Sequence, residues 1–182
     1  MNHLKLLCAF YFVATIMNAQ TSKTVYSCKD GKINFKSDAP MEIIQASSDK
    51  VSGNVDVTKR TFAFSVHIRS FEGFNVALQR EHFNENYMES EKFPSADFHG
   101  KIIEDVDLSK DGIYSVRAKG NFTIHGVEQE RIIKATVKVQ SNVIHITSKF
   151  TVLLKEHNIK IPKVVNEKVA SEVVVDVDAE MK

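Results

Sequence analysis

Long runs in which apolar and polar residues alternate constrain this chain more than any other feature. Between residues 61 and 69, every second position is apolar: Phe62, Phe64, Val66 and Ile68. A β-strand points successive side chains to opposite faces, so this period predicts a strand with one apolar face and one largely polar face. The same alternation recurs in four later segments: 114–125, 133–139, 144–154 and 169–177.

Shorter segments add further strand candidates, at 24–28, 32–36, 41–46, 51–57 and 96–103. Turn-forming residues fall between or within these candidates, at 30–31, 52–54, 110–112, 125–126 and 141–142. Eight to ten antiparallel strands with short connections indicate an all-β fold, either a sandwich or an up-and-down barrel. Several of the strands reach ten residues, which favours the tilted wall of a barrel.

One stretch, residues 74–88, breaks the period of two. It contains neither Gly nor Pro, and it places Phe74, Ala77, Leu78 and Glu81 on one helical face. The segment is followed by Phe93-Pro94, and a residue that precedes proline is disfavoured in a helix. We therefore expect one short helix or a few helical turns, inserted between strands.

The direction of the apolar faces decides what such a barrel could do. A membrane β-barrel turns its apolar face to lipid and carries aromatic girdles at both interfaces. This chain has no Trp and only four Tyr, so we expect the apolar faces to point inward. About eight strands enclose a space that side chains can fill or that can hold one ligand. The pattern alone leaves both a hollow and a packed interior open.

The first 19 residues have the pattern of a signal peptide. Lys5 precedes an apolar run from Leu6 to Ile16, and Ala19 offers a small residue for cleavage before Gln20. The run is too short to span a bilayer, and no transmembrane segment is expected after cleavage. We therefore expect a periplasmic or secreted protein with a single domain, residues 20–182. Cys28 is then the only cysteine, interpreted as a small buried residue, with a free thiol or an intermolecular link as alternatives.

Charge and motif content exclude several functions. Lys and Arg total 24 against 23 Asp and Glu, without long like-charge blocks, so no nucleic-acid-binding surface is expected. The chain has no GxSxG, HExxH, GxGxxG, P-loop or CxxC motif. The strand phase places His67, His125 and His145 on water-facing positions, which disfavours a metal site. We expect no catalytic constellation, no metal and no cofactor.

Two segments carry a family resemblance. Residues 82–102, HFNENYMESEKFPSADFHGKI, closely resemble the central signature of the YceI-like family. Residues 118–127, AKGNFTIHGV, are similar to a strand and turn of that family, and 31–40 and 159–162 add weaker matches. The chain departs from many members at Tyr26, where they have Trp. The resemblance implies an extended lipocalin-like antiparallel β-barrel, exported, with a long internal pocket for a polyisoprenoid or other amphiphilic lipid and no catalysis.

On this interpretation, the partner is an isoprenoid or fatty-chain lipid, held along inward-facing residues. The expected tail-binding residues are Phe62, Phe64, Val66, Phe98, Phe122, Ile124, Phe150 and Val152. The helical segment would supply a lid from Phe83, Tyr87 and Met88, because Met and aromatic side chains adapt to irregular apolar chains. Arg80 and His82 are candidates for a lipid head group, or else solvated helix surface.

Two other functions remain as alternatives. A barrel with a packed interior could act as an envelope protein-interaction module through its outer surface. An enzyme acting on small lipids is disfavoured, since no set of acid, base and nucleophile can be assembled. A homodimer is left open.

Overall fold

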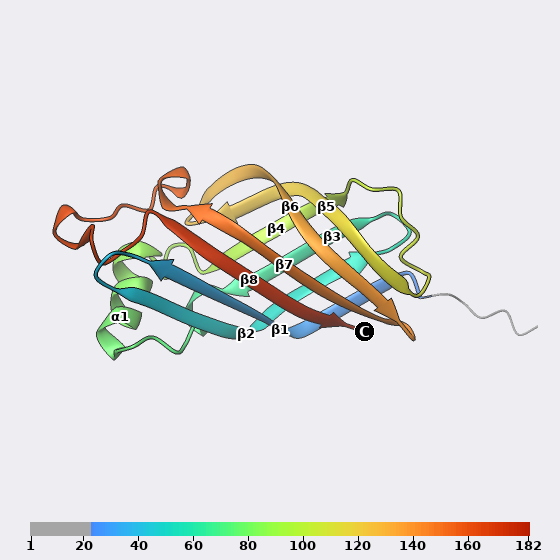
Figure 1. Cartoon of the computed structure of the whole chain (residues 1–182), viewed down its shortest axis with the longest axis horizontal. Helices are drawn as coiled ribbons and strands as arrows, with labels where there is room; N and C mark the ends of the chain where they lie inside the picture. The colour runs from blue at the N-terminus through green and yellow to red at the C-terminus, as the bar shows by residue number, and fades with distance from the viewer. Residues whose placement is uncertain (1–22) are drawn as a thin grey trace, which may run out of the picture.

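The computed structural model describes residues 23–182, and they form a closed antiparallel barrel of eight strands (Figure 1). Each strand pairs with the next in sequence, and the last pairs with the first. The bounds are β1 Val25–Asp38, β2 Ile43–Asp56, β3 Thr61–His67, β4 Ser95–Ile102, β5 Gly112–Ile124, β6 Val127–Gln140, β7 Val143–Leu153 and β8 Glu172–Met181. The predicted all-β barrel is confirmed. The proposed signal peptide and its cleavage site lie outside the described residues.

The first two strands are longer than the sequence analysis predicts. The segments 24–28 and 32–36 fall within one strand, β1, apart from Thr24, and residues 41–46 and 51–57 fall largely within β2. The interruption at Gly31 is a bulge, because the pairing with β2 shifts register on both sides of it. Gly53 lies within β2, where a Cβ atom would come within 2.3 Å of the Phe64 ring. These glycines therefore mark a bulge and a close approach, two roles that glycine takes inside strands.

The hairpin turns at 125–126 and 141–142 are confirmed. His125 and Gly126 adopt φ of 52° and 70°, and Ser141 and Asn142 adopt 52° and 61°. Positive φ at both central residues is the geometry that suits the twist of a two-residue hairpin.

A pair of facing glycines brings β4 and β5 unusually close. Gly100 and Gly120 are register partners. A Cβ on Gly120 would lie 2.1 Å from the His99 carbonyl oxygen, and one on Gly100 would lie 2.1 Å from that of Lys119. No side chain fits at either position unless the backbone moves.

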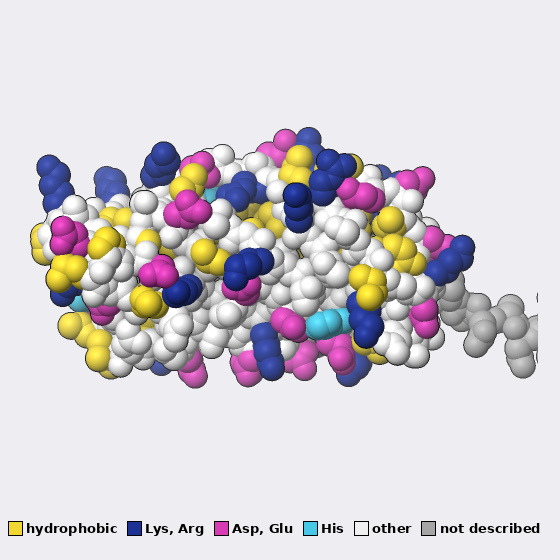
Figure 2. All heavy atoms as spheres, in the orientation of Figure 1, with side chains coloured by type: hydrophobic (Ala, Val, Ile, Leu, Met, Phe, Trp, Pro, Cys, Tyr) yellow, Lys and Arg dark blue, Asp and Glu magenta, His cyan; other side chains and the backbone are white. Residues whose placement is uncertain are grey.

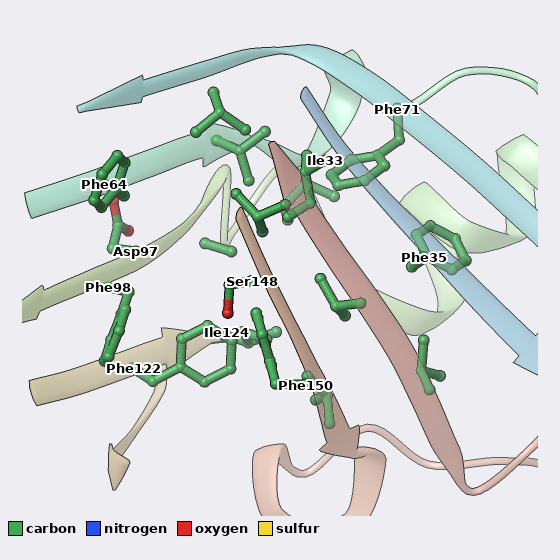
Figure 3. A pocket seen from close by; sticks show the side chains of 18 of the residues that line it. Ile33, Phe35, Phe64, Phe71, Asp97, Phe98, Phe122, Ile124, Ser148 and Phe150 are labelled. Carbon is green, nitrogen blue, oxygen red and sulfur yellow. The ribbon is translucent and has the colours of Figure 1, made fainter. Parts of the chain in front are cut away.

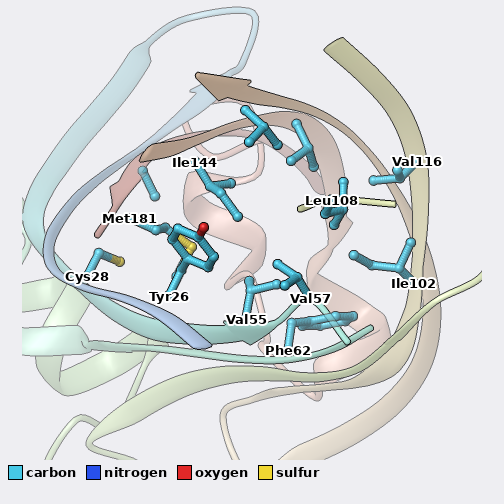
Figure 4. Packing of buried hydrophobic residues seen from close by; sticks show 13 residues of the cluster. Tyr26, Cys28, Val55, Val57, Phe62, Ile102, Leu108, Val116, Ile144 and Met181 are labelled. Carbon is cyan, nitrogen blue, oxygen red and sulfur yellow. The ribbon is translucent and has the colours of Figure 1, made fainter. Parts of the chain in front are cut away.

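One end of the barrel is filled by side chains, and we call it the closed end (Figure 4). Tyr26, Leu108, Ile144 and Met181 are almost completely buried there, in one cluster to which all eight strands contribute. Lys182 and Ser27 exchange two backbone hydrogen bonds of 2.9 Å, which fix the C-terminal residue against β1.

Helical turns and loops surround the other end, which we call the open end (Figure 1). Helix α1, Ala77–His82, continues into a wider turn, Phe83–Tyr87, so helical structure within residues 74–88 is confirmed. The helix starts three residues later than Phe74, and none of its residues is buried. The connection from β7 to β8 carries two short 3-10 turns, Leu154–His157 and Lys163–Val165, and a third, Ile68–Ser70, follows β3.

Charged side chains of both signs are spread over the face of the molecule that Figure 2 shows. Residues on β6 illustrate the alternation: Ile133, Val137 and Val139 are buried, while Lys134 and Lys138 are exposed. The apolar faces therefore point inward, as expected. Within residues 23–182, no helix has the length and apolar character needed to cross a membrane.

Candidate functional site

A cavity of about 530 Å³ runs inside the barrel. All eight strands contribute to its wall, and most of the lining side chains are apolar. Ligand-binding pockets typically occupy roughly 300–1,000 Å³ with a mainly apolar lining and few polar groups. The interior is therefore hollow, and of the two arrangements that the sequence leaves open, the packed one is wrong.

Four aromatic rings, which we call the mid-barrel rings, cross the cavity wall from β3 to β7: Phe62, Phe98, Phe122 and Phe150. Their ring centroids follow one another at 4.8, 5.8 and 5.7 Å, and the last two contacts are edge-to-face. Figure 3 shows Phe98, Phe122 and Phe150 facing one common space. Edge-to-face contacts of this kind stabilise aromatic pairs beyond their simple burial. The rings therefore form a rigid apolar surface on the cavity.

A second aromatic group, the mouth rings, lies toward the open end: Phe35, Phe71, Phe74 and Phe83. Phe83 stacks on Phe35 at 5.3 Å and contacts Phe74 at 5.2 Å and Phe71 at 5.7 Å. All four line the cavity. Of these, the sequence analysis names only Phe83 as a site residue. The alternation Ile33, Phe35 would have indicated Phe35, whereas Phe71 and Phe74 lie outside any strand.

The structure places all eleven predicted tail-binding and lid residues on the cavity wall. Their contact with a lipid stays a prediction. Met88 is 8% exposed and packs in one cluster with Ile68, Phe122 and Val152. It therefore anchors the helical segment to the barrel. Partial burial of Tyr87 beside it raises the pKa of the phenol.

The two head-group candidates lie apart. His82 is exposed and borders the cavity at the open end. Arg80 does not line the cavity: its Nη2 atom donates to the Arg69 carbonyl at 3.4 Å and lies 3.7 Å from Glu72 Oε1. Glu42, Gln79 and Lys168 line the mouth instead, beside His82. The sequence analysis missed these three because they come from separate segments.

Two of the serine hydroxyls on the cavity wall, those of Ser37 and Ser148, form hydrogen bonds with the protein itself. Ser148 Oγ donates to the Lys134 carbonyl at 2.7 Å, and Ser37 Oγ accepts from the Ala170 amide at 2.9 Å. Because these hydroxyls already have partners, the deep wall presents mainly hydrocarbon to a ligand.

Backbone pairing between β6 and β7 covers only part of the two strands, and we call the unpaired stretch the seam. Their ladder starts at the hairpin and ends at the pair Ala135 and Ser148. Beyond it, the Arg131 side chain bridges the strands, as Nη2 donates to the Thr151 carbonyl at 2.8 Å. The guanidinium also lies 6.0 Å from the Phe122 ring. A side chain thus completes the wall where backbone pairing stops.

Two histidines join the turn between β5 and β6 to the loop after β7. The prediction that His125 faces water is wrong, since its side chain is only 11% exposed. Its turn conformation directs Nδ1 to the His157 carbonyl at 3.0 Å and Nε2 to Glu89 Oε2 at 2.8 Å. His67 is exposed and His145 half-buried.

His157 is fully buried. Its Nδ1 donates to the Val127 carbonyl at 3.2 Å, and its Nε2 has no hydrogen-bond partner among the described residues. Burial lowers the pKa of this imidazole. Within residues 23–182, no three His, Cys, Asp or Glu side chains are grouped so as to hold a metal ion.

Comparison with known proteins identifies the family. Residues 24–181 match the sequence profile of the YceI-like domain. The chain belongs to the YceI-like family. No curated protein sequence gives a significant match.

Solved structures share the fold at low sequence identity. A polyisoprenoid-binding domain from Saccharophagus degradans, implicated in plant cell wall breakdown, superposes with a TM-score of 0.71 at 15% identity, over 87% of this chain and 98% of that one. BcnA of Burkholderia cenocepacia gives 0.69 at 14% identity, over 84% and 96%. The Campylobacter jejuni YceI protein gives 0.55 at 11% identity, over 99% and 97%. At such identities the likeness establishes the fold alone.

Proposed function

We propose that this YceI-like protein is a non-catalytic carrier that sequesters a polyisoprenoid or similar amphiphilic lipid in its cavity. The observation that carries the proposal is the continuous apolar cavity, closed at one end and bordered by polar groups at the other. The polyisoprenoid-binding domain from Saccharophagus degradans has a similar fold, which supports this class of ligand. The signal-peptide pattern of residues 1–19 supports a periplasmic or secreted carrier.

Burial of hydrocarbon supplies the affinity. Each buried methylene contributes about 0.8 kcal/mol, so a chain of a dozen contributes roughly 10 kcal/mol before the cost of association, which is about 4–15 kcal/mol. A longer chain than this is therefore needed for tight binding, unless the head group adds contacts. Glu42, Gln79, His82 and Lys168 are placed to meet a polar head at the mouth.

The residues that line the cavity do not indicate a catalysed reaction. Three serines line the cavity: Ser37 and Ser148 form hydrogen bonds with backbone groups, and no hydrogen bond joins these two or Ser65 to a histidine among the described residues. A nucleophilic mechanism needs such a base beside the hydroxyl.

Identification of a bound lipid tests the proposal. Protein purified gently from a native host is extracted with solvent and the extract is analysed by mass spectrometry. We expect a stoichiometric isoprenoid or fatty chain. Repeated empty extracts, together with no uptake of added polyprenyl lipid, would overturn the carrier.

Variants locate the ligand within the barrel. Phe150→Asp places a charge on the cavity wall and should abolish uptake of an anthroyloxy fatty acid, whereas Ile132→Asp on the exposed outer face should not. Since Phe150→Asp could impair folding, Ala135→Phe provides a second variant that narrows the cavity without adding charge. Equal uptake by all folded variants would contradict the cavity assignment.

A further inference from the structure

Large apolar side chains are exposed around the open end, and we call them the rim. They lie in three segments: the turn between β1 and β2 with the first residue of β2, the start of α1 with the residue before it, and the loop between β7 and β8. The rim comprises Met41, Ile43, Val76, Leu78 and Val164. Val164 is 88% exposed, more than any other large apolar residue of the described chain. A cluster of this kind on a soluble surface usually marks a site of interaction.

The rim is continuous with the cavity. Val76 and Leu78 themselves line the cavity, as do Ile44 and Val165, which neighbour the other rim residues in sequence. An apolar path therefore leads from the exposed side chains to the mouth rings and on into the barrel.

Hydrogen bonds hold the three rim segments together. The Met41 amide donates to the Glu167 carbonyl at 2.9 Å, which joins the β1–β2 turn to the loop after β7. Gln79 Nε2 donates to Glu42 Oε1 at 2.6 Å, which joins that turn to α1. The three segments that carry the rim are thus joined directly to one another.

Basic side chains accompany the rim on its loop side. Lys160, Lys163 and Lys168 are exposed, and no ion pair among the described residues involves them. Glu167 is the only acidic residue of the segment 159–170. On the helix side, Glu81 and Glu85 offset Arg80, which is already paired with Glu72. The charge therefore favours an anionic surface on one side of the rim only.

We propose that the rim docks on the surface of a lipid bilayer and turns the mouth of the cavity toward it. The proposal rests on the carrier function proposed above, because a lipid cargo resides in such a bilayer. Exposed apolar side chains beside lysines are the composition that binds at the headgroup and acyl boundary. Docking lets a lipid pass between bilayer and cavity along apolar surface, without exposing its chain to water.

Tryptophan reporters test the orientation directly, since the chain contains no Trp. Val164→Trp places a reporter on the rim, and Ile113→Trp is the matched control at the closed end, where Ile113 is 72% exposed. Vesicles of phosphatidylcholine, with and without phosphatidylglycerol, should shift the emission of Val164→Trp to shorter wavelength and leave that of Ile113→Trp unchanged. No shift with either vesicle, or equal shifts of both reporters, would overturn the proposal.

Sedimentation with the same vesicles measures the affinity. The double variant Leu78→Glu with Val164→Glu should lower the partition coefficient about tenfold or more, whereas Ile113→Glu should not lower it. All three positions are exposed, so folding is not at risk. The rim could instead bind a second copy of the chain. In that case the wild type would form concentration-dependent dimers, the double variant would not, and the two proteins would bind vesicles equally; this result would exclude the bilayer.

The two proposals fail separately. Ala135→Phe should lose uptake of the fatty acid while it keeps vesicle binding, because the rim is intact. Wild-type protein that binds vesicles through the rim but holds no lipid would overturn the proposed carrier function and support the docking proposal. Wild-type protein that holds lipid but does not bind vesicles would support the carrier function and overturn the docking proposal.

Discussion

The two ends of the barrel are built from the same alternating strands, yet packed side chains close the cavity at one end, whereas at the other end it is bordered by loops and helical turns. At the closed end, Tyr26, Leu108, Ile144 and Met181 interlock until almost no surface is left exposed. At the open end, the mouth rings contact one another around free space, and the neighbouring rim is exposed. Inward alternation therefore determines which side chains enter the barrel but not whether they fill it.

The difference comes from segments outside the strands and from side-chain length. Leu108 reaches the closed end from the connection between β4 and β5, and Met181 from the end of β8. At the open end, the long connection after β7 and α1 stand around the mouth, and α1 has no buried residue. The closed end therefore contributes more to the stability of the fold than the open end does.

The largest effect is expected at the closed end. Met181→Ala removes a fully buried side chain and should lower the free energy of unfolding by about 2–5 kcal/mol, as measured by urea denaturation. Met181 does not line the cavity, so uptake of the fatty acid by the folded fraction should stay unchanged. A loss below about 1 kcal/mol would show that this end is less tightly packed than described.

The boundary between the two regions is tested at the facing glycines. Gly120→Ala forces a methyl group against the backbone of His99 and should cost about 1–3 kcal/mol of stability. Gly112→Ala is the control, because its methyl group would meet only the Tyr114 side chain, at 3.1 Å or more. Equal urea midpoints for the two variants would contradict a constraint imposed by the close approach of β4 and β5.

A smaller effect on stability is expected at the open end. Phe83→Ala removes a half-buried ring that borders the cavity, so it should cost less than about 2 kcal/mol, below the range for a fully packed Phe. It should nevertheless weaken uptake of the fatty acid. A loss of stability as large as that of Met181→Ala would remove the distinction between the two ends.

The smallest effect concerns pH. The pKa of His157 is lower in the folded protein, so the unfolded chain binds the extra proton first as the pH falls below about 6.5. Stability from this group is complete above that pH and is lost as the pH falls from there toward the folded pKa, by at most about 1.4 kcal/mol per pH unit. Urea denaturation between pH 7.5 and 5 should show a shallower slope for His157→Asn, which keeps a donor near the Val127 carbonyl. Identical slopes would contradict this.

The sequence predicts the wall well because alternation is a local signal. The strands and the helical stretch near residues 77–87 follow from period and turn residues, the barrel from strand length, and the inward apolar faces from the lack of Trp and the few Tyr. The predicted bounds of the first two strands are wrong because Gly31 and Gly53 lie in segments that are typical of turns, although both residues lie within strands. His125 breaks the strand phase because a hairpin turn redirects its side chain.

The site is predicted only in part, since it depends on contacts between segments distant in sequence. Each of the eleven cavity residues named from the sequence lies on a strand face or in the helical segment. Phe71, Glu42 and Lys168 reach the cavity from turns and loops, where no period indicates a direction. A cavity remains only where the inward side chains together are too small to fill the barrel, and the alternation of apolar and polar residues does not determine that total volume.

At the seam between β6 and β7, the distance between the two strands is not fixed by backbone hydrogen bonds. Main-chain ladders fix the spacing of paired strands, but at this height the two strands are joined by the reach of Arg131 to Thr151. A residue of different length at position 131 would change the bore locally and leave both flanking ladders intact. The spacing of the wall at this seam therefore depends on one side chain, whereas elsewhere along these strands it depends on main-chain pairing.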